Sequence, residues 1–160
     1  MFRVGFGQDS HRFSTDPSRP LVIGGVVFEG QPGLEGDSDA DVVLHALCRA
    51  LEQAIGGDSF SRYADAMSRA GIDDSGEYVK VARSNVEDAG YRIGNVGITI
   101  EALRPRIEPH ASRMKESIAT LLGIADDVVG INASTGDGLT AFGRGEGVQA
   151  FVIVGLVALS

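Results

Sequence analysis

Two acidic stretches of the chain place carboxylates and imidazoles at spacings that suit a metal ion. Asp9 and His11 lie two residues apart, and His45 ends the acidic stretch 37–45. The chain has only one further histidine, His110. Three protein ligands with an open fourth position are typical of catalytic rather than structural zinc. Asp9, His11 and His45 are therefore candidate ligands of one divalent metal ion.

On spacing alone, two interpretations of these residues stay open. An Asp-x-His at a strand end is as often a hydrogen-bonded turn as a ligand pair, so the histidines could be structural. If a metal ion binds, imidazole and carboxylate ligands favour zinc. A nearby carboxylate should then orient one imidazole, and Asp41 or Asp39 could serve.

Two glycine-rich segments further along the chain carry polar groups. The segment 134–138 offers hydroxyls, backbone amides and the Asp137 carboxylate, which suit phosphate oxygens and Mg²⁺. A plain turn is the simpler interpretation of its spacing. Arg144 is isolated among glycines, where it can bind a phosphate in bidentate fashion or pair with Glu146 or another subunit.

The element that should position Asp9 and His11 is a strand over residues 2–7. If the backbone stays extended beyond it, side chains at i and i+2 share a face, so Asp9 and His11 converge. Two apolar segments around a Gly-Gly pair, over residues 21–28, predict a β-hairpin with a primed turn.

His45 should lie on a helix that begins near Ser38 or Asp39, because either side chain can cap the free amides. The helix should end at Gly56-Gly57. Its apolar stripe, with His45 at the edge, is formed by Leu44, Leu47, Leu51 and Ile55.

The remaining patterns predict more helices and strands in one layered arrangement. Residues 58–76 show no clean period and are interpreted as a flexible, partly helical excursion. Helices are expected over 76–89 and from Pro109 to Leu122, and strands over 92–102, 128–133 and 148–159. The order predicts an α+β (α/β layer) fold, a single domain over residues 1–160 with a mixed β-sheet packed on one side by helices.

Composition excludes several classes of protein. The net charge of −8 argues against a nucleic-acid partner, since such proteins need basic surface. The single cysteine, Cys48, cannot form an intrachain disulfide and suggests a reducing compartment. No secretory signal is visible, and the longest apolar run, residues 148–159, is too short to span a bilayer. We expect a cytoplasmic protein without a membrane partner.

The motifs, taken in order, resemble those of the 2-C-methyl-D-erythritol 2,4-cyclodiphosphate synthase family of the non-mevalonate isoprenoid pathway. They span essentially the whole chain. The matching pieces are Gly5-Phe6-Gly7-x-Asp9-x-His11, Ser38-Asp39-x-Asp41-Val42-x-x-His45-Ala46-Leu47, Gly57-Asp58, Gly94-Asn95-Val96, Pro105-Arg106, Pro109-His110 and Phe142-Gly143-Arg144-Gly145-Glu146-Gly147.

This resemblance implies a homotrimer built around the sheets, with three active sites between adjacent subunits. Asp9, His11 and His45 would be its zinc ligands. The enzyme would be a phosphorus-oxygen lyase that converts 4-diphosphocytidyl-2-C-methyl-D-erythritol 2-phosphate into the cyclic diphosphate and CMP. A Mg²⁺ or Mn²⁺ ion would bridge the α- and β-phosphates.

The resemblance also assigns roles residue by residue. Arg144 would line a cavity on the threefold axis, where the family can hold an isoprenoid diphosphate. The implied catalytic residues are Asp37, Thr135 and Asp137. The implied substrate-binding residues are Asp9, His11, Ser38, Asp58, Ala102, Pro105, Arg106, Ile107, Ser134, Thr135 and Arg144.

Several positions depart from the family pattern and keep two other functions open. Asp37 stands where the family commonly has His, and Asp137 where it has Glu. The loops around Ser59-Phe60 and 63–65 also differ. These changes favour, as an alternative, a non-catalytic zinc-binding paralogue that senses an isoprenoid diphosphate or nucleotide. A zinc-dependent phosphoesterase is the third hypothesis.

Overall fold

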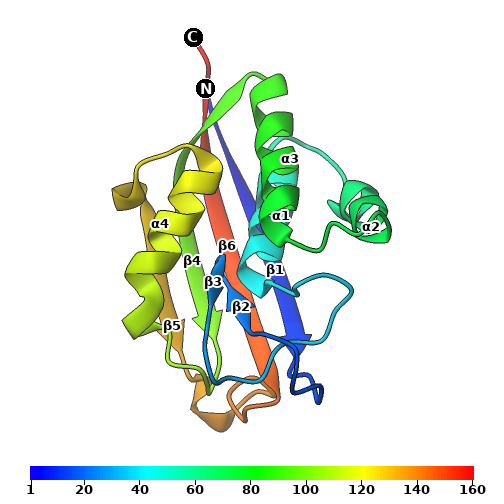
Figure 1. Cartoon of the computed structure of the whole chain (residues 1–160). Helices are drawn as coiled ribbons and strands as arrows, with labels where there is room; N and C mark the ends of the chain where they lie inside the picture. Colours follow the sequence, from blue (N-terminus) through cyan, green and yellow to red (C-terminus); the bar gives the residue numbers. More distant parts are fainter.

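A four-stranded mixed sheet is covered on one face by helices in the computed structural model, which describes residues 1–160 (Figure 1). The strand order is β1-β6-β4-β5, with β4 and β5 parallel and the other neighbours antiparallel. This confirms the predicted fold class. The strands are β1 (Phe2–Arg12), β4 (Tyr91–Glu101), β5 (Val129–Ser134) and β6 (Gly147–Ala158).

The helices form a layer on this sheet. Helix α1 packs on β1 and β6, α3 packs on α1, and α4 covers β5, whereas α2 lies to one side (Figure 1). None of the helices combines the length and apolar character that crossing a membrane requires. Their bounds are α1 (Val42–Ala54), α2 (Ser61–Arg69), α3 (Ser75–Asp88) and α4 (Ala111–Leu122). The small hairpin consists of β2 (Val22–Ile23) and β3 (Val26–Val27).

Most predicted elements are present, with shifted ends. The first strand continues to Arg12, so Asp9 and His11 lie within it. The hairpin turn is confirmed, with φ of 61° at Gly24 and 74° at Gly25, as a primed turn requires. The excursion over 58–76 contains α2, and the other boundaries differ by a few residues.

The predicted start of the helix that carries His45 was wrong. Asp41, not Ser38 or Asp39, is the N-cap of α1, and its side chain accepts hydrogen bonds from the amides of Val43 and Leu44. Ala40 has a φ of 56°, which interrupts any helical path through the preceding residues.

Helix α1 lies directly against β1 because glycines face it. A Cβ at Gly5 would lie 1.9 Å from the Ala50 carbonyl oxygen, and a Cβ at Gly7 would lie 2.0 Å from that of Ala46. No side chain therefore separates the two backbones. Asp9 follows Gly7 on the same face of the strand, so the close contact brings it toward α1.

The other face of the sheet is open and apolar. Its side chains come mainly from β1 and β6, and Phe6 is half exposed although it stacks on Phe151 at a centroid distance of 6.1 Å. The exposed apolar residues of these two strands are Phe2, Val4, Phe6, Ile153 and Val157. Cys48, by contrast, is fully buried on α1.

Replacing Gly7 with alanine tests the contact between α1 and β1. We expect Gly7→Ala to lower the free energy of unfolding by at least about 2 kcal/mol, because the new methyl group meets a backbone carbonyl that cannot move aside. Chemical denaturation followed by circular dichroism measures the change. Gly130→Ala is the matched control: its Cβ would meet only one atom, at 3.9 Å, and should change stability by less than about 1 kcal/mol. Equal effects of the two substitutions would contradict the close packing.

Candidate metal centre and active site

Three potential metal ligands converge where β1 meets α1. Asp9 Oδ2 lies 2.9 Å from His11 Nε2 and 3.1 Å from His45 Nδ1. The two imidazole nitrogens are 3.3 Å apart. The alternation of side chains along β1 puts Asp9 and His11 on one face of the strand. Helix α1 packs directly against that face and brings His45 close to them. The predicted convergence is confirmed.

The arrangement fits a tetrahedral zinc ion. Each of the three residues offers one ligand atom, all within 4.8 Å of one another. Zinc bonds of about 2.0–2.1 Å in a tetrahedron place ligand atoms about 3.3 Å apart, close to the separations found here. Two imidazoles and one carboxylate leave a fourth position for water or substrate. The donor set is therefore that of a catalytic site.

Asp9 is held in its ionised form. Burial would raise the pKa of this carboxyl, but hydrogen bonds from His11 and His45 and their charge outweigh burial and keep the pKa well below its usual range. The guanidinium of Arg49 adds a positive charge 3.7 Å from Asp9 Oδ1. A carboxylate in this state is available as a metal ligand.

The orientation of His45 is set by hydrogen bonds on the far side of its ring. His45 Nε2 lies 2.8 Å from Ser75 Oγ and 3.2 Å from Ser38 Oγ. Ser75 donates its hydroxyl to Asp39 Oδ1, and its amide donates to Asp39 Oδ2 at 3.1 Å. The Nδ1 atom faces Asp9 and His11, and if a metal ion takes the place of the proton that Nδ1 shares with Asp9, Nε2 can still donate to the Ser75–Asp39 pair.

Of the two carboxylates expected to orient the imidazole, Asp39 acts through Ser75 and Asp41 does not act on it. The Asp41 carboxylate accepts four backbone N–H groups, two from the hairpin turn and two from the first turn of α1, at 2.7–3.2 Å. Burial and the charge of Asp39 raise the pKa of Asp41 to about 6 despite these donors. Asp41 therefore fixes the start of α1. Ser75 was missed, because only its place at the start of a helix marks it in the sequence.

A cavity of about 240 Å³ opens beside the three ligands. Asp37 and Ser38 line it, so the structure brings these two predicted residues to the metal ligands. Asp37 is exposed, and its carbonyl accepts a hydrogen bond from the Ser68 hydroxyl at 3.1 Å. Side chains that the sequence did not single out for the site also line the cavity, among them Arg49, Phe60, Ala64, Asp65, Ser68 and Tyr78.

The other predicted residues do not line this cavity, and all of them except Asp58 form a second group. Ala102 follows β4 and donates its amide to the Ser134 carbonyl at the end of β5, at 3.0 Å. Thr135 accepts the amide of Asp137 through its hydroxyl at 3.4 Å, and Asp137 has a φ of 50°. The same segment after β4 contains Pro105, Arg106 and Ile107.

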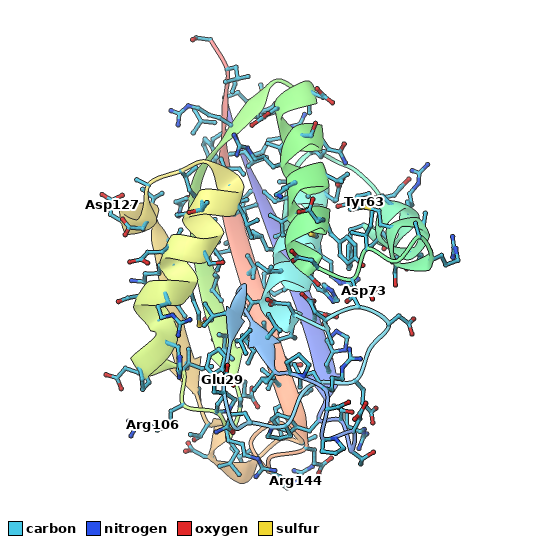
Figure 2. All side chains as sticks on the ribbon, in the orientation of Figure 1. Glu29, Tyr63, Asp73, Arg106, Asp127 and Arg144 are labelled. Atoms are coloured by element: carbon cyan, nitrogen blue, oxygen red, sulfur yellow. The ribbon has the colours of Figure 1, made fainter.

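Both arginines of the second group are exposed at one end of the molecule (Figure 2). Arg106 lies 3.7 Å from Glu108, and Arg144 lies 3.5 Å from Glu146. Asp58 belongs to neither group: it is exposed just before α2 and pairs with Arg62 at 2.5 Å. One chain thus places its predicted site residues on two separate surfaces.

The fold and the cluster define an α+β protein with a candidate metal site, and comparisons with known proteins identify its family. The profile of the YgbB family matches residues 2–157. The chain belongs to the YgbB family.

Curated relatives carry one name. The 2-C-methyl-D-erythritol 2,4-cyclodiphosphate synthase of Chlamydia muridarum is 44% identical over 156 residues, covering 96% of this chain and 87% of the relative. The synthase of Chlamydia caviae is 41% identical, covering 96% and 88%. The likeness spans nearly the whole length of these proteins.

Solved structures match nearly the whole fold of this chain. The bifunctional IspDF from Campylobacter jejuni matches with a TM-score of 0.91 and 30% identity, covering 100% of this chain and 43% of that one. A 2C-methyl-D-erythritol-2,4-cyclodiphosphate synthase in a CDP-bound form matches with a TM-score of 0.86 and 29% identity, covering 97% and 100%.

Removing the Ser75 hydroxyl tests the orientation of His45. We expect Ser75→Ala to weaken zinc binding about 10- to 100-fold, because the imidazole loses the nearer of its two hydroxyl partners and the link to Asp39. Competition with a chromophoric chelator measures the affinity. Ser112→Ala, an exposed serine on α4, is the control and should bind zinc as the unmodified protein does. Unchanged zinc affinity in Ser75→Ala would show that His45 needs no such support.

Proposed function

We propose that this chain is a 2-C-methyl-D-erythritol 2,4-cyclodiphosphate synthase, acting as one domain over residues 1–160. The observation that carries the proposal is the cluster of Asp9, His11 and His45 beside an open cavity, in a chain whose near full-length relatives bear that name. In the reaction, a 2-phosphate oxygen forms a bond to the β-phosphorus while the bond from that phosphorus to the α-phosphate bridging oxygen breaks. CMP leaves, so the enzyme is a phosphorus-oxygen lyase.

Such a reaction needs positioning and charge neutralisation more than acid–base chemistry. Asp9, His11 and His45 would hold a zinc ion, which would supply a Lewis acid for a phosphate oxygen. The Ser38 hydroxyl, at the cavity rim, can donate to another phosphate oxygen. Asp37 also lines the cavity, but a carboxylate accepts hydrogen bonds rather than donating them, so we assign it no donor role.

The second group of residues supports a homotrimer. Ala102, Pro105, Arg106 and Ile107 would bind the cytosine, and the 134–137 loop would hold the diphosphate with Mg²⁺ or Mn²⁺ through Asp137. These residues lie outside the metal cavity of their own chain. In a trimer, the second group of one chain could face the metal cavity of a neighbouring copy and complete its site. The open apolar face of β1 and β6 supplies a surface for this contact between copies.

Two details of the assignment rest on the family alone. Asp58 would approach the substrate, which requires its pair with the exposed Arg62 to open. Arg144 would line a cavity on the threefold axis and meet an isoprenoid diphosphate there. Its weak 3.5 Å pairing with Glu146 leaves the guanidinium free to do so.

The sensor paralogue and the phosphoesterase predict different products from those of a synthase. The reported relatives all carry the synthase name, and they give no support to a sensor paralogue. A phosphoesterase would use the same cluster but give an open-chain product. Product analysis therefore separates the three functions.

The unmodified protein, supplied with the cytidylyl substrate and Mg²⁺, should form CMP and a cyclic diphosphate. ³¹P NMR measures both products. We expect His45→Ala to lose bound zinc and at least about 100-fold in turnover, since it removes one of three ligands. His110→Ala changes the only histidine outside the cluster, and this variant should keep both its bound zinc and its turnover rate. An open-chain product would identify a hydrolase, no turnover by the unmodified protein would favour the sensor, and full activity in zinc-free His45→Ala would overturn the metal site.

The trimer can be tested on the open face of the sheet. Light scattering should give three times the 16.8 kDa chain mass for the unmodified protein. Phe6→Asp should yield monomers, because it buries a charge in the proposed contact. Val27→Asp, at an exposed position of the hairpin, is the control and should remain a trimer. A monomeric unmodified protein, or a trimeric Phe6→Asp variant, would contradict this interface.

A further inference from the structure

The metal cavity is acidic for a site that must accept phosphate. Asp9, Asp37 and Asp65 all line it, and the whole chain carries a net charge of −8. Among the lining residues, Arg49 is the only lysine or arginine. An incoming phosphate dianion therefore meets three carboxylates and one permanent side-chain cation.

Arg49 is placed for this role by α1. It lies one turn after His45, so the two side chains share a face of the helix. Its Nη2 is 3.7 Å from Asp9 Oδ1, beyond hydrogen-bonding distance, and no hydrogen bond within the chain engages its guanidinium. The side chain is 43% exposed. Its five N–H donors are thus free for a ligand in the cavity.

Phe60 holds the guanidinium over the cavity. The Arg49 Cζ lies 5.1 Å from the Phe60 ring centroid, within the range of a cation–π interaction. The same ring lies 5.4 Å from the imidazole centroid of His45. Phe60 therefore contacts both the metal-ligand cluster and the arginine, and limits the directions in which Arg49 can point.

We propose that Arg49 is a phosphate-contacting residue of the active site, which binds the phosphate group that sits beside Asp9, His11 and His45. This inference rests on the proposed function. A planar guanidinium can donate two parallel hydrogen bonds to one phosphate group. The three carboxylates of the cavity carry three negative charges. A divalent ion and the Arg49 guanidinium together carry three positive charges, so the cavity has no net charge when both are present. Without Arg49 the phosphate would enter a negative site.

A purely structural arginine would behave differently. If Arg49 only positioned Asp9, its removal would loosen that ligand, weaken zinc binding and lower activity as a consequence. If it contacts phosphate, its removal would lower activity and phosphate affinity while zinc stays bound. The test therefore measures zinc and phosphate binding separately.

The experiment compares Arg49→Gln and Arg49→Lys with the unmodified zinc-loaded protein. We expect Arg49→Gln to lose about 100-fold in kcat/KM and to retain full zinc content. Its affinity for inorganic pyrophosphate, measured by calorimetry, should fall about 10-fold. Arg49→Lys should recover part of both losses, because it restores the charge but not the planar fork. Arg113→Gln, which makes the same charge change at an exposed position on α4, should alter none of these quantities.

Any other result would contradict either the phosphate contact of Arg49 or the proposed function. Loss of zinc in Arg49→Gln together with activity would overturn phosphate contact in favour of a role in positioning Asp9. Unchanged kcat/KM and pyrophosphate affinity would overturn the inference outright. If the unmodified protein turns over no substrate, the proposed function fails, whereas the pyrophosphate comparison still decides whether Arg49 binds phosphate.

Discussion

The contact between the backbones of α1 and β1 determines where the chemistry can occur. Gly5 and Gly7 have no side chains to hold the helix away, so α1 rests on the strand itself. Asp9 and His11 continue the same face of β1 beyond the glycines. Their side chains therefore emerge at the first turns of α1, where His45 lies. A larger residue at either glycine would displace the helix and separate the ligands.

Elements that come later in the chain complete the environment of His45. Helix α3 contributes Ser75, which accepts from the ring, and α2 follows Phe60, which lies over it. Helix α2 is itself anchored through Tyr63, whose hydroxyl donates to the buried Glu52 of α1 at 3.1 Å (Figure 2). Asn85 of α3 donates to the same carboxylate at 2.8 Å. The loop that departs from the family pattern is thus tied to both neighbouring helices.

This network gives the divergent residues a physical role. Burial raises the pKa of Tyr63 far above its usual range, so the phenol remains a donor to Glu52 at neutral pH. A fixed α2 holds Phe60 over the cavity, and Phe60 in turn holds Arg49. Phe60 and Tyr63 both belong to the segments in which the sequence resemblance leads us to expect departures from the family pattern. Tyr63 and Phe60 therefore help to fix the side of the cavity on which Arg49 lies.

The sequence predicted the parts of the fold and site that depend on local periodicity. Alternation in β1 placed Asp9 and His11 on one face, and the Gly-Gly pair marked the hairpin turn. The helix start was misplaced because three neighbouring polar residues can cap, and only the left-handed conformation of Ala40 selects Asp41. Ser75 and Arg49 escaped notice because their roles arise from contacts between elements that are distant in the chain. The two separate surfaces could be expected only from the family resemblance.

We infer that α1 and β1 hold one metal ion through three specific atoms. An anomalous difference map at the zinc edge, from crystals of the zinc-loaded protein, tests it most directly. We expect one peak per chain at about 2.0–2.1 Å from Asp9 Oδ2, His11 Nε2 and His45 Nδ1, with Ser75 still hydrogen-bonded to His45 Nε2. A peak bound by His45 Nε2, or zinc held elsewhere in the protein, would contradict it.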